Sequence, residues 1–591
     1  MRMLDFIERL IARYRSVGGE ISRGGTEQAL PYEGTLASLT LAEAALRKLQ
    51  VNREYPDHNP QIAVIGPTQA GKSTVVNLLL EKPLAGVSAL AGFTVHPQGF
   101  CIDSRTEEYP WLPDFFTGYR QLPPAELPNA PYRAFSLSEA GGAPLPPSVL
   151  WDTPDFDSVD ASGYRDAVLR TAALADLLLL VVSKDKYADQ RVWETLELLI
   201  PLGRPLVVCI NKVDEASREV IPDSFRRHLT EKGIPAERLP LCTLPYRKGL
   251  DPSGQGIDSD AVDRLRALMT GLASTPDREQ QARHLYRFIR LHWEEWLTPI
   301  RAEQAAEARW EEMVRQALEK ALADYRRDYL DHPQNYETFQ QAIAELLTLL
   351  EVPLLADSLN RMRRVITWPL RQVIGAGKSL FGKGEEHGGK GSNQEQQLLN
   401  QMAHHTLVHL AEEALDLGET EPEQSAWWKG IAHALREERP HIEQRFAQAV
   451  ENYQARFQPE IERSARRLHE QLQQQPAILN TLRTARVTTD AAAVVLAVKS
   501  GGLSVHDLVV APAMLSLTSM LAESTLGHYM DRVAAELKQR QQEMVEKELL
   551  ASLGLELAAL ERHIDPARRF HIPEAEVTAA EQELERLAHD H

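Results

Sequence analysis

The residues best suited by type and spacing to chemistry lie in the segment Gly66–Thr74, which reads GPTQAGKST. It follows the apolar run QIAVI and precedes the helical pattern STVVNLLL, the strand–loop–helix setting in which a G-x-x-x-x-G-K-[ST] loop wraps phosphate groups. Loop N–H groups and the positive end of the helix favour phosphate, so we expect Lys72 to reach the β- and γ-phosphates of a nucleotide and Ser73 to ligate Mg²⁺. The predicted nucleotide-binding residues of this loop are Gly66, Pro67, Thr68, Gln69, Ala70, Gly71, Lys72, Ser73 and Thr74.

A second segment resembles a motif that determines which base is bound. The apolar run PLVVCI ends in Asn211-Lys212-Val213-Asp214, and an N-K-x-D box after an apolar strand resembles the guanine-specificity motif of the GTPase superfamily. A carboxylate at Asp214 can accept hydrogen bonds from both N1–H and the exocyclic amine of guanine, and adenine has no such pair of donors. We expect Lys212 to lie along the plane of the base and Asn211 to complete this part of the site.

Taken in this order, the phosphate loop and the N-K-x-D box resemble the GTPase superfamily over residues 55–275. The segment VLWDTPD resembles the superfamily's D-x-x-G motif. This resemblance implies that Asp152 holds Mg²⁺ through water. Asp155 replaces the glycine whose amide senses the γ-phosphate, and its carboxylate would repel that phosphate unless it points away. Phe156 stands where Ras-like enzymes carry the glutamine that orients the attacking water.

The same resemblance assigns the remaining site residues. Thr94, just before His96-Pro97, is placed like the first-switch threonine of dynamin- and Era-like proteins, which closes onto Mg²⁺. Cys242 and Thr243 follow an apolar run and resemble the fifth motif, which braces the base. The predicted metal ligands are Ser73, Thr94 and Asp152.

Catalysis needs a substitute for the missing glutamine. In dynamin-like and other dimer-activated GTPases, polar phosphate-loop residues take that part. Thr68 and Gln69 are therefore the catalytic candidates, together with Lys72 and Thr94. We expect hydrolysis to be slow for the isolated molecule and to be stimulated by self-association into a homodimer or a higher assembly.

The pattern of apolar residues predicts the elements that position these groups. Between residues 60 and 250, short apolar runs alternate with helical segments, which is typical of a parallel sheet with crossover helices. The Pro-rich stretch 105–148 is expected to form a loop with edge strands. After residue 275 the apolar residues recur at helical spacing. The expected fold class is an α/β P-loop GTPase domain, with a mostly parallel sheet flanked by helices, plus a long all-α helical bundle or stalk.

This pattern divides the chain into three parts. Residues 1–54 form N-terminal helices expected to pack like a neck with the C-terminal bundle, residues 55–275 form the GTPase domain, and residues 276–591 form the bundle. Within the bundle, the basic and apolar segment 361–394 and the apolar segment 490–528 are predicted contact tips. They either touch an anionic membrane surface or are buried in the bundle or in an oligomer interface.

Composition limits the partners. The chain has 84 acidic and 65 Lys or Arg residues, for a net charge of −19, so extensive nucleic-acid binding is not expected. Its three cysteines lack metal-ligand spacing and fit free thiols in a reducing cytosol. The N-terminus reads as an amphipathic helix, and no apolar run is long enough for an ordinary membrane span. We expect a cytoplasmic protein, either soluble or peripheral at the inner face of the membrane.

Three functions fit these observations. Helices before and after the GTPase domain resemble the layout of bacterial dynamin-like proteins, which implies nucleotide-driven self-association coupled to a stalk that acts at a membrane. A regulatory GTPase switch whose helical region binds a protein partner is the alternative. An Era-like switch that docks on ribosomal RNA is disfavoured, because nothing in the sequence resembles a basic RNA-binding module.

Overall fold

The computed structural model describes residues 2–23, 32–86, 94–131, 133–156, 161–214, 217–234, 239–245, 259–273, 277–331, 342, 346, 394–474 and 527–589. The predicted contact tips, 361–394 and 490–528, lie outside these residues except at their last positions. The chain forms two compact units. Unit 1 comprises Met1–Gln304 with Pro566–His591, and unit 2 comprises Ala305–Asp565.

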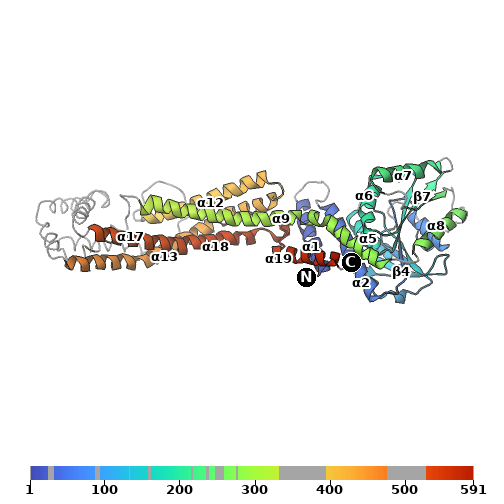
Figure 1. Ribbon diagram of the computed structural model, residues 1–591, viewed down its shortest axis with the longest axis horizontal. Helices are drawn as coiled ribbons and strands as arrows, with labels where there is room; N and C mark the ends of the chain where they lie inside the picture. Colours follow the sequence, from blue (N-terminus) through green and yellow to red (C-terminus); the bar gives the residue numbers. More distant parts are fainter. Residues whose placement is uncertain are drawn as a thin grey trace. The chain divides into compact units, whose positions relative to one another are not determined.

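Unit 1 contains a mostly parallel sheet, as predicted (Figure 1). Within the described residues it has eight strands in the order β3-β4-β2-β5-β1-β6-β7-β8. Only the β2–β5 pair is antiparallel among the neighbours in this order. The strands are β1 (Gln61–Ile65), β2 (Gln98–Ile102), β3 (Arg120–Gln121), β4 (Ala134–Gly141), β5 (Ser148–Asp152), β6 (Leu177–Ser183), β7 (Leu206–Val213) and β8 (Leu241–Pro245).

Helices cover both faces of this sheet, because alternate side chains of each strand point to opposite faces. On one face, Ile62 and Val64 of β1 share a core with α3 (Lys72–Leu80) and α8 (Ser259–Ala273). On the other, Ala63 and Ile65 share a core with α5 (Ala161–Leu174), α6 (Gln190–Leu199) and α7 (Val220–Glu231). The nearly uninterrupted apolar sequence of β6 follows from this two-sided burial.

Two elements, strand β2 and a short helix in the Pro-rich stretch, were not expected from the sequence. Strand β2 pairs with β5, and its Gly99 lies so close to the ring of Trp151 that a Cβ atom would be 3.0 Å from it. A glycine in a short run of mixed polarity weakens the strand signal, although here it makes room for the tryptophan. The short helix is α4 (Leu112–Phe115). The same stretch also contains β3, at the edge of the sheet, and β4 beside it, in line with the strands expected there.

Helices from both ends of the chain pack in unit 1. Helix α1 (Met3–Arg23) contacts α2 (Glu33–Glu54) and α19 (Glu574–His589). The hydroxyl of Tyr14 in α1 donates to the carbonyl of Trp296 (2.7 Å), and the Trp296 indole donates to Ser38 in α2 (2.8 Å). Trp296 belongs to α9 (Arg278–Tyr325), whose first part lies in unit 1. These buried hydrogen bonds tie three helices together.

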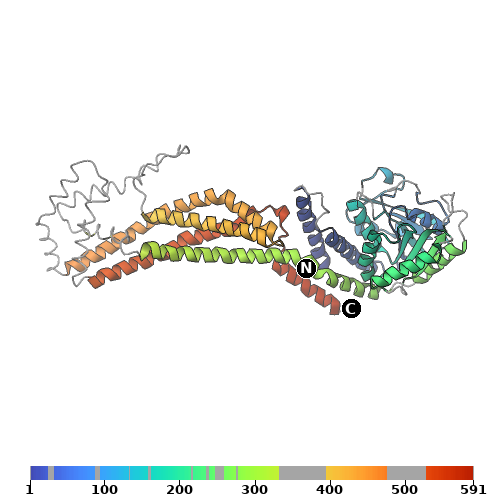
Figure 2. The same cartoon turned by 90° about the horizontal axis from the view of Figure 1, so that it is seen from above.

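Unit 2 is built from long helices that lie side by side (Figures 1 and 2). They are the second part of α9, α12 (Gln394–Thr420), α13 (Ser425–Gln473), α17 (Gly527–Met544) and α18 (Ala551–Ala559), with π-helical turns at Arg326–Leu330 and Val545–Leu550. Buried Glu395 of α12 accepts hydrogen bonds from Tyr325 of α9 (2.7 Å), Tyr453 of α13 (2.9 Å) and Gln541 of α17 (2.7 Å). The predicted long helical region is therefore present. Within the described residues, no helix is long and apolar enough to cross a bilayer.

Candidate nucleotide-binding site

The phosphate loop lies between β1 and α3, as its sequence predicts. Helix α3 begins at Lys72, directly after Gly71, whose φ of +93° is readily adopted only by glycine. A Cβ atom on Gly66 would lie 2.1 Å from the backbone oxygen of Val181 in β6, and one on Gly71 would lie 2.4 Å from Nδ2 of Asn211. Close backbone approach thus requires both glycines of the motif.

The Lys72 side chain is buried and pointed back into the loop. Its Nζ donates to the carbonyl oxygens of Gly66 (3.0 Å) and Pro67 (3.3 Å) and forms an ion pair with Asp155. Asp155 follows β5 and is itself buried. The carboxylate that replaces the D-x-x-G glycine therefore contacts the lysine that was predicted to bind phosphate.

The three predicted metal ligands come together at one point. Ser73 Oγ donates to Asp152 Oδ2 at 2.7 Å and lies 3.3 Å from Thr94 Oγ1. The other oxygen of Asp152, Oδ1, is buried and has no hydrogen-bond partner among the described residues. Burial raises the pKa of Asp152 to about 6, although the Ser73 hydroxyl and the Lys72 ammonium favour its charged form. An all-oxygen group with an unpaired buried carboxylate oxygen fits Mg²⁺.

The N-K-x-D box contacts the phosphate loop directly. Asn211 Nδ2 donates to the carbonyl oxygen of Ala70 (2.9 Å), and Lys212 Nζ donates to that of Gln69 (2.7 Å). Gln69 and Lys212 both have a φ of +60°, so the two segments hold each other in an uncommon backbone conformation. The segments predicted to bind phosphate and base are thus joined by hydrogen bonds.

Asp214 has partners that the sequence did not indicate. Lys184, which follows β6, donates to Asp214 Oδ2 at 2.7 Å, and the backbone N–H of Ser217 donates to Oδ1 at 3.0 Å. These hydrogen bonds lower the pKa of Asp214 to about 2. The carboxylate is therefore ionised at neutral pH, which is the acceptor form that guanine recognition requires.

The other predicted residues differ in their surroundings. Thr68 and Thr74 are half-buried, and Gln69 is exposed. Cys242 is buried, and its thiol donates to the carbonyl oxygen of Ala261 in α8 (3.7 Å). Thr243 in β8 is the register partner of Ile210, the residue before Asn211.

Phe156 is buried in the same core as α5 and α2. It therefore fills space in the core and offers no polar group to a water molecule. Thr153, which the sequence did not single out, anchors the turn between Asp152 and Asp155 by donating to the carbonyl oxygen of Val64 at 2.7 Å.

The mostly parallel sheet has a phosphate loop after β1, the first strand in the chain, and an N-K-x-D box at the end of β7, two places along the sheet. This arrangement is that of a P-loop GTPase domain. Comparison with known proteins agrees: residues 61–212 match the model of the 50S ribosome-binding GTPase family.

Two relatives illustrate the likeness. The tRNA modification GTPase MnmE of Halorhodospira halophila is 32% identical over 161 residues, which cover 27% of this chain and 26% of MnmE. The probable GTP-binding protein EngB of Burkholderia ambifaria is 26% identical over 216 residues, which cover 34% of this chain and 83% of EngB. The chain thus spans about a quarter of the length of MnmE, and the matches concern the GTPase domain.

Two solved structures are also similar. A variant of Aquifex aeolicus Era bound to GDP·AlF4⁻ is 17% identical, with a TM-score of 0.24, and the match covers 36% of this chain and 56% of Era. A chain of an oligomerised bacterial dynamin pair is 10% identical, with a TM-score of 0.23, and the match covers 95% of this chain and 83% of that one.

Proposed function

We propose that this protein binds GTP and GDP with Mg²⁺ and hydrolyses GTP to GDP and phosphate. The observation that carries the proposal is the joining of the N-K-x-D box to the phosphate loop through Asn211 and Lys212. Because the two segments are hydrogen-bonded, one nucleotide can reach both the ionised Asp214 and the N-terminus of α3. The base-recognising carboxylate then selects guanine over adenine.

In this proposal each residue of the site has a role in positioning or charge stabilisation. Loop N–H groups and Lys72 hold the phosphates, and the N-terminus of α3 favours their negative charge. Ser73, Thr94 and Asp152 hold Mg²⁺, which neutralises charge on the β- and γ-phosphates when it is bound. Thr68 and Gln69 are the candidates for orienting the attacking water, since Phe156 has no polar group.

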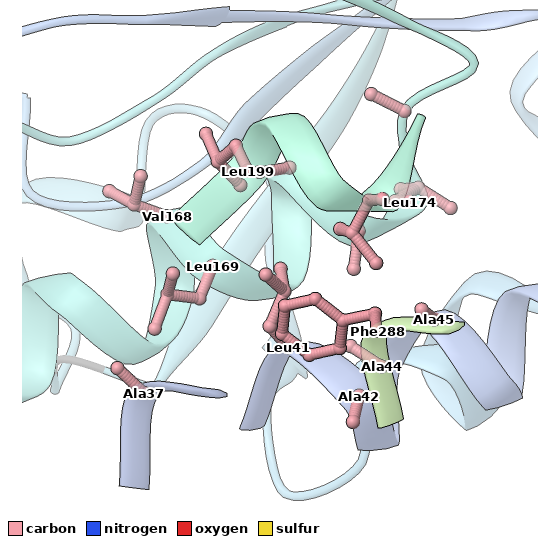
Figure 3. Close-up of a cluster of buried hydrophobic side chains, with 14 of the residues drawn as sticks. Ala37, Leu41, Ala42, Ala44, Ala45, Val168, Leu169, Leu174, Leu199 and Phe288 are labelled. Atoms are coloured by element: carbon pink, nitrogen blue, oxygen red, sulfur yellow. The ribbon is translucent and has the colours of Figure 1, made fainter. Parts of the chain in front are cut away.

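We further propose that GTP drives self-association and that the helical region couples it to action at a membrane surface. One observation supports the self-association and another supports its coupling to the other helices. Gln69 is exposed at the phosphate loop, where a second molecule can order it. Helix α5, which follows Asp152 and Asp155 in the chain, packs on α2, with Leu169 near Ala37 and Leu41 (Figure 3).

This packing offers a physical route from the site to the other helices. A shift of α5 on nucleotide binding moves the surface on which α2 rests, and α2 contacts α1, which contacts α19. Packed helices transmit displacement because protein interiors are nearly incompressible. In the proposed layout, 1–54 acts as a neck with the C-terminal helix and 276–591 acts as the stalk.

Hydrolysis measured against protein concentration tests the self-association. If two copies complete the site, the rate per molecule rises over about a hundredfold range of concentration, by mass action. Light scattering should detect dimers with a GTP-state analogue and fewer with GDP. A rate per molecule that stays flat while the enzyme remains active would leave the GTPase assignment intact and remove self-association.

Co-sedimentation with vesicles separates the membrane role from its alternative. The test uses the full chain, anionic and neutral vesicles, and GDP or a GTP analogue. The proposal predicts sedimentation with anionic vesicles that depends on the nucleotide. No sedimentation with any nucleotide would favour a regulatory GTPase whose helical region binds a protein partner.

A further inference from the structure

The ammonium group of Lys72 already contacts three oxygen atoms. An ammonium has three N–H donors, and the partners here are the carbonyl oxygens of Gly66 (3.0 Å) and Pro67 (3.3 Å) and the carboxylate of Asp155. Lys72 is 4% exposed, so water can do little to solvate its positive charge. A phosphate that binds Lys72 must therefore replace one of these partners or share the ammonium with it.

Asp155 is the partner that can be replaced. Gly66 and Pro67 belong to the phosphate loop itself, whose backbone is fixed between β1 and α3. Asp155 belongs to the segment after β5, and its hold on Lys72 is the side-chain ion pair. Thr153 anchors the start of that segment to Val64, so Asp155 remains close even when its carboxylate leaves the ammonium.

GDP and GTP differ in how strongly their phosphates compete with Asp155 for Lys72. The β-phosphate lies within the loop, whose N–H groups and helix N-terminus supply most of its binding. The γ-phosphate relies on the lysine and on the D-x-x-G segment, where this chain has a carboxylate. A buried carboxylate near a second anion disfavours that anion, because the two negative charges repel in a site with little water.

We propose that Asp155 is a specificity-determining residue that favours GDP over GTP by competing with the γ-phosphate for Lys72. This inference rests on the proposed guanine-nucleotide binding. According to this inference, Asp155 in place of the motif's glycine makes the GTP-bound state less favourable than it would be with glycine at position 155. A second copy of the protein then contributes more to stabilising the GTP-bound state.

Two substitutions at position 155 test the proposal. Asp155→Asn removes the negative charge and keeps the side-chain size, while Asp155→Gly restores the motif's glycine. Asp114→Asn, an exposed aspartate of α4, is the matched control. The affinities of GDP and of the non-hydrolysable analogue GMPPNP are measured with Mg²⁺ by calorimetry on the full chain.

We expect Asp155→Asn and Asp155→Gly to tighten GMPPNP binding by about tenfold or more while GDP binding changes by less than about threefold. Asp114→Asn should leave both affinities unchanged. Equal changes for both nucleotides, or weaker GMPPNP binding, would overturn the role given to Asp155. GDP binding by each variant also shows that it is folded.

The same data separate this proposal from the one on which it rests. If the wild-type protein binds neither guanine nucleotide, the proposed function is wrong. If it binds GDP and the ratio of the two affinities is the same in the wild type and both variants, only the inference about Asp155 is wrong. If one of the two variants does not fold, the other still tests the inference. Asp155→Asn removes only the charge, whereas Asp155→Gly also removes the side chain.

Discussion

Replacing Gly66 by alanine perturbs the phosphate loop where its backbone comes closest to the sheet. The added Cβ atom would lie 2.1 Å from the carbonyl oxygen of Val181 and 3.2 Å from its carbonyl carbon. Both are backbone atoms in the middle of β6, which pairs with β1 and β7 and cannot move alone. The loop must therefore shift outward by more than about 1 Å to reach ordinary contact distance, a displacement of the size that costs about a hundredfold in site function.

The expected result for Gly66→Ala is a loss of about a hundredfold in GDP affinity and of about 1–3 kcal/mol in the free energy of unfolding, the usual cost of overpacking. Affinity falls because the shift also moves the carbonyl oxygen to which Lys72 donates. Calorimetry measures the binding, and urea unfolding measures the stability.

Gly271→Ala is the matched control for this experiment. Gly271 lies in α8 of the same unit, and nothing lies within 4 Å of a Cβ atom added there. Alanine is favoured over glycine in a helix by about 0.5–1 kcal/mol, so this variant should bind GDP normally and be slightly more stable. GDP affinity of Gly66→Ala within about threefold of the wild type would refute the assigned loop geometry.

Three further predictions test other parts of the molecule. Asp214→Asn should weaken GTP binding by at least about tenfold and favour xanthosine triphosphate in a competition assay, because the amide offers one acceptor where guanine needs two. Lys48→Met removes the ammonium 3.1 Å from buried Asp176 and should lower the free energy of unfolding in urea by about 3–5 kcal/mol. Adding Asp176→Asn should recover only part of it, because buried Arg204 then loses the same carboxylate. Burial and the Lys48 charge lower the pKa of His58 to about 4. Between pH 6.5 and 4 the unfolded chain therefore binds more protons than the folded chain, and the free energy of unfolding falls as the pH falls through that range. From pH 7.5 to 5.5 the wild type should therefore lose about 1 kcal/mol more than His58→Gln. An equal loss in both proteins would contradict this.

Much of the site could be predicted because its motifs are local in sequence. The segment Gly66–Ser73 needs only the strand before it and the helix after it, and both have strong apolar patterns. Asn211 and Asp214 follow the apolar run of β7 in the same way. Parallel strands end at one edge of a sheet, and this brings the two segments together: Asn211 contacts Ala70 and Lys212 contacts Gln69.

The remaining features depend on which strands and helices are neighbours. Lys184 reaches Asp214 because β6 lies next to β7, an order that sequence periodicity does not give. Asp155 was expected to conflict with a phosphate, but its pairing with Lys72 requires the turn after β5 to face α3. Strand β2 was missed because Gly99 and its mixed neighbours give no clear alternation.

The packing of α2 on α5 could not be predicted from the sequence pattern either. Helix α2 has buried residues around most of its circumference, including Ser38, Thr40 and Glu43. Such a helix has no single apolar face from which a partner could be predicted. The charge of buried Glu43 is balanced by Arg170 of α5, which donates to it at 2.6 Å, and by Arg47. The pair with Arg170 is visible only in the fold.

Binding of four nucleotides to the full chain with Mg²⁺ tests the central claim most directly. Calorimetric titration with GDP, GMPPNP, ADP and AMPPNP compares both the base and the γ-phosphate in one experiment. The joined phosphate loop and N-K-x-D box predict that the guanine nucleotides bind at least about a hundredfold more tightly than their adenine counterparts. Equal affinity for ADP and GDP, or no binding of either, would contradict the assignment of a guanine-nucleotide site.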